Sequence, residues 1–206
     1  MNILAIETST DWCGIAFIQN GQCSHKIEQK IPRKHAEKLP LFYESLCDKI
    51  NLNKIELDGI AVSIGPGSFT GLRVGLGFSK GLAFAKQLPI VPVPTLNVIA
   101  ANSGIEKGEY SVLLYSHRDI VYGQNFSGSI PINEEEAKTW DSINRTGLIV
   151  QYGCEKIMVD ENYSSVPPSA ETTGLLAEKN FHEWVNKSPY DLVPNYISPF
   201  ELGVKK

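Results

Sequence analysis

The sequence has few of the residues that build metal sites, disulfide frameworks or nucleophilic active sites. Its 206 residues include four Cys and four His, and the cysteines (Cys13, Cys23, Cys47 and Cys154) stand too far apart for a CxxC pair. No HExxH metal motif and no Walker A phosphate loop occurs. Because scattered cysteines are typical of a reducing compartment, we expect a cytoplasmic protein.

Long apolar segments and an excess of positive charge are also missing. The longest uncharged stretch, residues 87–105, contains three prolines and is typical of a strand, a turn and a buried helix rather than a membrane span. The 19 Lys and Arg are outnumbered by 23 Asp and Glu, and the net charge is +2 over residues 1–103 but −6 over residues 104–206. We therefore expect no membrane partner and no strong binding of nucleic acid by the isolated chain.

The hydrophobic pattern of the first half predicts strands and helices in a definite order. In chain order they are strands at 3–6, 14–18 and 22–29, a helix at 32–50, a strand at 59–64, a helix at 69–86, a strand at 88–93, and a helix at 95–101 capped by Thr95. Three antiparallel strands, extended by parallel strands through crossover helices, form the ribonuclease-H-like arrangement.

The second half of the chain has the pattern of a reduced copy. It predicts a strand pair at 110–115 and 120–126, a helix at 133–143 capped by Asn133, a strand at 148–152 and a helix at 169–185. We therefore expect an α/β protein of two tandem ribonuclease-H-like halves with mixed sheets, residues 1–103 and residues 104–206. This is the architecture of actin-like ATPases, Hsp70 and sugar kinases.

A glycine-rich helix is the most informative segment. Small residues recur every four positions in two rows, Gly71-Gly75-Ser79-Ala83 and Gly77-Gly81-Ala85. Each glycine in a helix interior costs about 1 kcal/mol relative to Ala, so close packing must offset that loss. The rows have two interpretations: packing on the chain's own sheet, and docking of a helix from another subunit. Both can hold, on opposite faces of the helix.

Four segments of the first half carry a family resemblance. They are ILAIETST followed by Cys13, His35-Ala36-Glu37 before Leu39-Pro40, GPGSFTGLRVGLGFSKGLA from Gly65, and Val93-Pro94-Thr95-Leu96. In this order they resemble the TsaB family, the bacterial tRNA threonylcarbamoyladenosine biosynthesis proteins once grouped with glycoproteases. The second half departs from the family's pattern: Tyr115-Ser116-His117-Arg118 stands where an Asp-Ala-Arg motif is usual.

The resemblance implies a non-catalytic scaffold or activating subunit. Such a subunit docks to the related catalytic protein TsaD, with TsaE as a further ATPase partner. The complex would transfer a threonylcarbamoyl group to the adenosine next to the anticodon of tRNAs that read A-starting codons. On this reading the chain contacts tRNA only indirectly, and we expect it to form a homodimer when its partner is absent.

The residues themselves argue against chemistry by this chain alone. The catalytic relative binds metal through His-x-Glu-x-His, but this sequence has Leu39 in place of the second His after His35. We expect no catalytic residue, no metal ligand and no tightly bound cofactor. The hydroxyls of Thr8, Ser9 and Thr10 are candidates for a residual phosphate turn, and ATP or ADP is a candidate ligand at a subunit junction.

The expected partner interface combines the two long helices of the first half. Its residues are His35, Leu39, Phe42, Phe69, Leu72, Arg73, Gly75, Leu76 and Ser79. Two other functions stay open. An autonomous actin-like ATPase or small-metabolite kinase would bind and turn over ATP without a partner, and a metal-dependent peptidase would hold stoichiometric metal.

Overall fold

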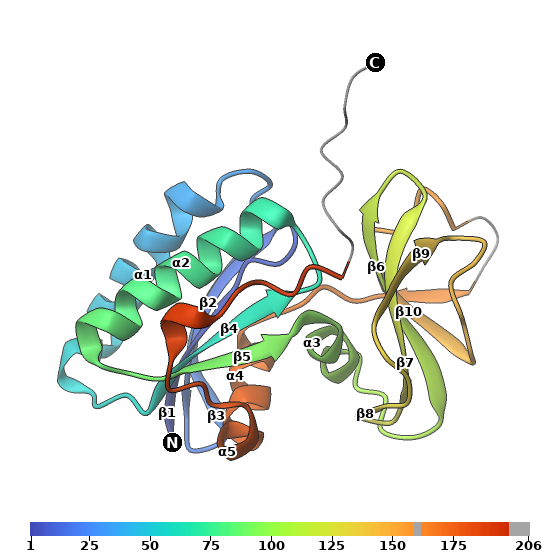
Figure 1. The fold of residues 1–206 in the computed structure, drawn as a ribbon. Helices are drawn as coiled ribbons and strands as arrows, with labels where there is room; N and C mark the ends of the chain where they lie inside the picture. Colours follow the sequence, from blue (N-terminus) through green and yellow to red (C-terminus); the bar gives the residue numbers. More distant parts are fainter. Residues whose placement is uncertain (159–161, 198–206) are drawn as a thin grey trace.

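Two mixed β-sheets organise the chain, and the computed structural model describes residues 1–158 and 162–197 (Figure 1). The first sheet has the order β3-β2-β1-β4-β5, with β1 at Asn2–Glu7, β2 at Trp12–Gln19, β3 at Gln22–Lys30, β4 at Gly59–Gly65 and β5 at Ile90–Pro94. The second has the order β11-β10-β6-β7-β8, with β6 at Glu109–His117, β7 at Ile120–Ser127, β8 at Ile130–Pro131, β10 at Leu148–Tyr152 and β11 at Tyr163–Ser165. A further strand, β9 (Glu136–Thr139), pairs with β7.

The two sheets repeat one topology. In the first, β1 is antiparallel to β2 and parallel to β4. In the second, β6 is antiparallel to β7 and parallel to β10. The second sheet is the reduced copy, because no helix lies between β9 and β10, where the first sheet has one after its third strand. The expected pair of ribonuclease-H-like halves is confirmed.

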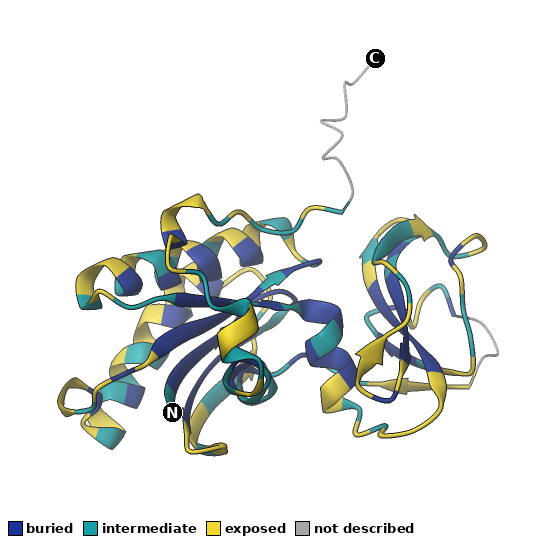
Figure 2. Ribbon diagram, turned by 60° about the horizontal axis from the view of Figure 1, so that its bottom comes forward, coloured by how far each residue is buried: buried dark blue, intermediate teal, exposed yellow. Residues whose placement is uncertain are grey.

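Helices cover both faces of the first sheet. They are α1 (His35–Ile50), α2 (Phe69–Lys86), α3 (Thr95–Asn102), α4 (Ala170–Lys179) and α5 (Phe181–Trp184), with 3-10 turns at Leu52–Lys54 and Pro189–Asp191. Side chains alternate along β1 as in any strand. Leu4 and Ile6 pack in one core with α1 and α2, whereas Ile3 and Ala5 pack in another core with α4. Strands β1, β2, β4 and β5 are mostly buried between these layers, whereas the edge strand β3 is largely exposed (Figure 2).

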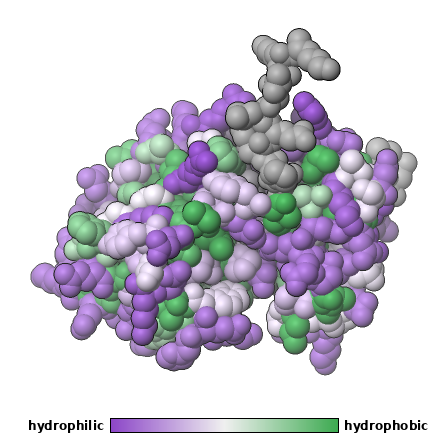
Figure 3. Space-filling model, in the orientation of Figure 1, coloured by the Kyte–Doolittle hydropathy of each residue, from purple (hydrophilic) through white to green (hydrophobic). Residues whose placement is uncertain are grey.

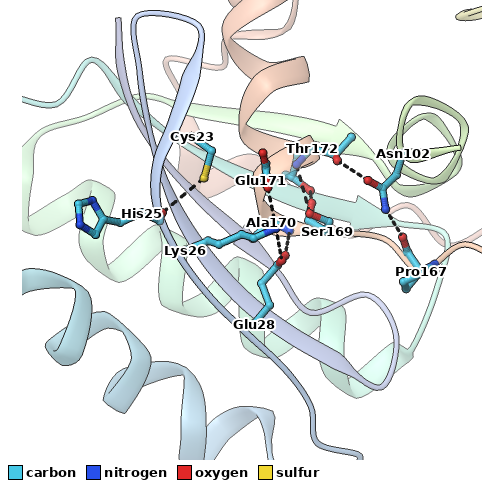
Figure 4. A network of polar contacts seen from close by, with 11 residues as sticks. Cys23, His25, Lys26, Glu28, Asn102, Pro167, Ser169, Ala170, Glu171 and Thr172 are labelled. Atoms are coloured by element: carbon cyan, nitrogen blue, oxygen red, sulfur yellow. Dashed lines mark hydrogen bonds and ion pairs between the residues drawn. The ribbon is translucent and has the colours of Figure 1, made fainter. Parts of the chain in front are cut away.

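The last long helix does not stay with the second half. Helix α4 packs on β1 and β2 of the first sheet, and its N-terminus is bonded to β3 (Figure 4). Glu28 accepts a hydrogen bond of 2.5 Å from the backbone N–H of Ala170, and Lys26 pairs with Glu171 at 2.6 Å. The expected division at residue 103 therefore separates the two sheets but assigns α4 to the wrong one.

Helix α3 packs against both sheets. Leu96, Ile99 and Ala100 pack with core residues of the second sheet, whereas Val98 packs in a core of the first sheet. The halves therefore cannot separate without exposing apolar surface.

Three local predictions are wrong. Residues 133–143 do not form a helix, because 136–139 pair with β7 and the Asn133 side chain accepts a hydrogen bond from the Asn125 N–H. Thr95 does not cap α3: its buried hydroxyl has no hydrogen-bond partner among the described residues. The helix expected at 169–185 is divided at Asn180.

Within the described residues, no helix is long and apolar enough to cross a membrane.

Candidate functional site

A buried carboxylate lies at the end of the first strand. Glu7 is 1% exposed. One of its oxygens accepts hydrogen bonds from the Ser9 N–H at 2.7 Å and the Ser9 hydroxyl at 2.5 Å. The other accepts from the hydroxyl of Thr173 on α4 at 3.2 Å and from the hydroxyl of Ser63 on β4. Glu7 therefore joins β1, β4 and α4.

The surroundings of Glu7 suit a structural cross-link better than a catalytic acid. Burial raises the pKa of Glu7 above its usual value, while hydrogen bonds from Ser63, Ser9 and Thr173 oppose that rise. Four donors surround the carboxyl group, and the Thr173 proton is shared with the Ser169 carbonyl at 2.9 Å, so little acceptor capacity is left for a substrate. Sequence analysis missed this centre, whose one local signal is an acidic residue ending an apolar strand before a run of hydroxyl residues.

Helix α2 closes over the turn that follows Glu7. The Thr8 hydroxyl donates to the carbonyl of Gly71 at 2.8 Å, and the Ser68 N–H donates to the carbonyl of Ser9 at 2.7 Å. A Cβ added at Gly71 would lie 2.1 Å from the Thr8 carbonyl oxygen, and one at Gly75 would lie 2.2 Å from the Thr8 hydroxyl oxygen. These distances leave no room for a methyl group, so glycine is required for the helix to approach the turn.

The three residues expected to form a residual phosphate turn are engaged within the chain. Thr8 and Ser9 are fully buried and Thr10 is 8% exposed. The Thr8 and Ser9 hydroxyls donate as described above, and the Thr10 hydroxyl oxygen accepts from the Trp12 N–H at 3.2 Å. Because α2 lies against this turn, a phosphate would have to displace the helix to reach Thr8 or Ser9.

Most of the expected interface residues face the interior. His35, Leu39, Leu72, Gly75, Leu76 and Ser79 are all buried in the chain. Leu39 and Leu76 belong to the core beneath α1 and α2, and a ring nitrogen of His35 lies 3.0 Å from the carbonyl oxygen of Trp12. Phe42 is half-buried against the same core. The expectation that the six buried residues meet a partner is wrong, since the sheet already covers them.

The other small-residue row of α2 points away from the sheet. Gly77 and Gly81 are exposed, and a Cβ added at either would meet no atom within 4 Å. Ala85 is exposed and Phe84 is 71% exposed. We call Gly77, Gly81, Phe84 and Ala85 the outward row. The two rows of small residues thus have different surroundings: Gly71 and Gly75 pack on the chain itself, whereas Gly77 and Gly81 face open space.

The outward row has defined borders on α2. On one side Phe78 meets Tyr43 of α1 edge-to-face, with ring centroids 5.7 Å apart. On the other side lie the remaining expected interface residues, half-buried Phe69 and exposed Arg73, whose guanidinium stacks 3.8 Å from the Phe69 ring. Hydrophobic side chains occur in separate groups among hydrophilic ones in the view of Figure 3.

Polar contacts join the two lobes, which are the parts of the molecule built on the first and on the second sheet. The Tyr152 hydroxyl donates to Asp11 at 2.5 Å, and Lys30 lies 3.3 Å from the same carboxylate. The Asn195 side-chain amide donates to Glu135 at 2.6 Å. Burial raises the pKa of Glu135 to about 7, against the opposing hydrogen bond from Asn195. The structure thus places an acid that titrates near neutrality at the lobe junction.

Comparison with known proteins gives a family match over the middle of the chain. The family model described as TsaD, tRNA N6-adenosine threonylcarbamoyltransferase, matches residues 25–140. The chain is 39% identical over 102 residues to the tRNA threonylcarbamoyladenosine biosynthesis protein TsaB of Haemophilus influenzae, a match that covers 48% of this chain and 42% of that protein. It is 33% identical over 113 residues to TsaB of Escherichia coli, covering 55% of this chain and 48% of that protein.

The matches to these curated relatives thus span less than half of the relatives' own length. Similarity to solved structures extends further. YeaZ from Pseudomonas aeruginosa has a TM-score of 0.80 at 25% identity, over 95% of this chain and 99% of that one. The fold described above is therefore shared, over nearly the whole chain, with a solved structure.

Proposed function

The chain belongs to the family of the TsaD model, tRNA N6-adenosine threonylcarbamoyltransferase, within which it resembles TsaB. From this premise we propose that it is a non-catalytic subunit for threonylcarbamoyladenosine formation in tRNA. It docks to a TsaD catalytic subunit and supports transfer of the threonylcarbamoyl group to the adenosine next to the anticodon. TsaE is the further ATPase partner, and the complex works in the cytoplasm.

One observation carries the proposal: the outward row of α2. Interior helix glycines cost about 1 kcal/mol each relative to Ala. Gly71 and Gly75 are explained by the turn beneath them, but nothing in the described chain approaches Gly77 or Gly81. Small side chains on a helix let a partner helix come close, and Phe84, 71% exposed beside them, supplies apolar area. A docked helix explains both features.

The buried site supports a role without catalysis. The Glu7 carboxylate is surrounded by donors from its own chain, His35 contacts a backbone carbonyl, and Thr8 lies beneath α2. If a nucleotide binds, we place it at the junction between subunits, with groups from the partner. The net charge of −4 fits a subunit that leaves tRNA contact to its partner.

The same outward row offers a surface for self-association. Without a TsaD partner, two copies can pair through it in a symmetric dimer, because such a pair covers Phe84 on both. We therefore propose a homodimer for the isolated chain, which mass measurement across a concentration series tests. Monomer at every concentration would contradict it.

A paired substitution tests the docking proposal. Gly81→Arg adds a long charged side chain to the open side of α2 without touching the core. We expect at least a 100-fold loss of TsaD affinity, about 2.7 kcal/mol, with an unfolding midpoint no lower than that of the wild-type chain, because Arg is a better helix former than Gly. Ala101→Arg is the matched control, because it places the same side chain at an exposed position of α3.

The readouts are complex mass and reconstituted modification of tRNA with and without this chain. Absence of a complex under all conditions, including nucleotide and TsaE, would rule out the docking proposal. Equal loss for Gly81→Arg and Ala101→Arg would show that the outward row is not the interface. Tight ATP binding and turnover by the lone chain would favour the autonomous ATPase instead.

A further inference from the structure

A segment near the C-terminus lies along α2, beside the outward row (Figure 1). We call residues 189–196 the C-terminal strap. Its inner side is anchored by buried Pro189 and by Leu192, which packs against the core beneath α1 and α2. Its outer side chains are exposed: Tyr190 by 58%, Val193 by 71% and Tyr196 by 41%.

The C-terminal strap contacts the border of the outward row. The Tyr196 ring lies 5.2 Å from that of Phe69, and its hydroxyl accepts a hydrogen bond of 2.9 Å from Arg73. Farther along the helix, Lys80 donates to the Tyr190 carbonyl at 2.9 Å. The Tyr190 ring also lies 6.2 Å from that of Phe84. The strap thus contacts Phe69 and Arg73, two of the three expected interface residues that are not fully buried.

The C-terminal strap also connects this helix face to the second lobe. The Asn195 N–H donates to the Ile64 carbonyl on β4 at 2.7 Å, while its side chain donates to Glu135 of the second lobe at 2.6 Å. Gly65 has a φ of +118°, and a Cβ there would lie 2.7 Å from the Asn195 carbonyl oxygen. Glycine at this position therefore lets the strap lie against the end of β4.

The outer part of the strap is weakly held. Within the described chain, one backbone hydrogen bond, from Asn195 to Ile64, joins residues 193–196 to other segments. The remaining contacts are the part-buried hydrogen bond from Asn195 to Glu135 and the exposed contacts of Tyr196 with Phe69 and Arg73. Exposed side-chain pairs contribute little in water. Segments with few backbone hydrogen bonds and much exposed surface open at low free-energy cost.

We propose that the C-terminal strap is an intramolecular cover of the Phe69–Arg73 border, which a docking partner must displace to occupy this side of α2. The inference rests on the proposed function, since the displacing partner is TsaD. When the strap leaves, Asn195 releases Glu135, so docking on α2 also frees one contact between the lobes. Because only the uncovered fraction of molecules binds, the strap lowers the apparent affinity by that fraction.

Variants that release the C-terminal strap test whether it covers the docking surface of α2. Tyr196→Ala removes the ring from Phe69 and the acceptor from Arg73 without altering α2, and Asn195→Ala removes the contact with Glu135. Tyr163→Ala is the matched control, because Tyr163 is also 41% exposed but lies on β11. We expect Tyr196→Ala and Asn195→Ala to bind purified TsaD about five- to tenfold more tightly than the wild-type chain, and Tyr163→Ala to bind equally.

The TsaD affinities of the strap variants support or overturn the inference. Tighter binding by the release variants, with faster amide exchange in residues 189–196 when TsaD is added to the wild-type chain, supports the inference. Equal or weaker binding by Tyr196→Ala overturns it, because the strap would then be neutral or part of the interface. No binding by any variant, wild type included, overturns the proposed function and the displacement role with it.

Discussion

The two sides of helix α2 carry the same kind of residue in opposite surroundings. Gly71 and Gly75 are buried against the turn after β1, where an added Cβ would meet Thr8 at 2.1 Å and 2.2 Å. Gly77 and Gly81 are on the open side, where an added Cβ meets nothing within 4 Å. A small side chain is therefore a steric necessity on one side and, in our proposal, an adaptation to a partner on the other.

The largest effect is expected on the inward side. Gly71→Ala puts a methyl group against the backbone carbonyl of Thr8, which cannot turn aside as a flexible side chain would. We expect a loss of about 3 kcal/mol or more in the free energy of unfolding, although Ala is the better helix former. Urea denaturation followed by circular dichroism measures it. Wild-type stability would mean that the turn and α2 are farther apart than described.

The next effect concerns the carboxylate beneath the same turn. Glu7→Ala removes the acceptor shared by Ser9, Ser63 and Thr173 and leaves a cavity. We therefore expect the free energy of unfolding to fall by about 2 to 3 kcal/mol. Glu7→Gln keeps the shape and one acceptor oxygen and is expected to lose less than about 1 kcal/mol. The same denaturation measurement separates the two variants. Equal losses would show that charge, rather than hydrogen bonding, is what this centre requires.

The third effect is a pH dependence at the strap that borders the open side. The pKa of Glu135 is about 7 in the folded chain against 4.5 ordinarily. The folded chain therefore holds a proton that the unfolded chain has released, and stability falls as pH rises from about 4.5 to about 7. Since Glu135 is partly exposed, we expect the free energy of unfolding to fall by about 1 to 2 kcal/mol across this pH range.

Glu135→Gln tests this dependence, because the amide stays neutral and still accepts from Asn195. The variant should be more stable than the wild type at pH 7.5 and equally stable near pH 4. Glu183→Gln, at an exposed position of α5, is the control and should change neither value. A wild-type profile that is flat across this window would mean that Glu135 ionises in both states at the same pH.

The smallest effect is expected on the outward side and has the opposite sign to the first. Gly77→Ala meets no neighbour and improves helix propensity, so we expect a gain of about 0.5 to 1 kcal/mol. It is the same substitution as Gly71→Ala, six residues along one helix. If both variants lose stability alike, the contrast between the two sides of α2 is wrong.

The sequence predicts the secondary structure of the first lobe more completely than that of the second. The hydrophobic pattern predicted the strand pair of the second half and β10, and the glycine-rich segment predicted α2 with its observed bounds, Phe69–Lys86. Residues 133–143 were mistaken for a helix, because their pattern contains no sign of the β7 backbone that pairs with Glu136–Thr139. Local propensity loses to an available strand edge when pairing satisfies the backbone donors.

The candidate site was predicted as a set of residues but not as a surface. Phe69 and Arg73 lie at the border of the proposed interface, whereas Leu39, Leu72 and Leu76, predicted to lie in that interface, are buried in the core. Helical spacing places residues on a common side of a helix but does not say which side meets the sheet. That choice follows from the total apolar area each orientation buries.

By itself the sequence determined the strand and helix order of the first half, the repeated fold and the family, because these depend on local periodicity and on motif identity. Only the tertiary structure decided three further properties: that α4 returns to the first sheet, that Glu7 sits among four donors, and that residues 189–196 cover one border of α2. Each depends on at least one contact between segments more than 100 residues apart in the chain, which for Glu7 is the contact with Thr173. Such contacts leave no local pattern, because they are selected by the burial and hydrogen bonding of the whole fold.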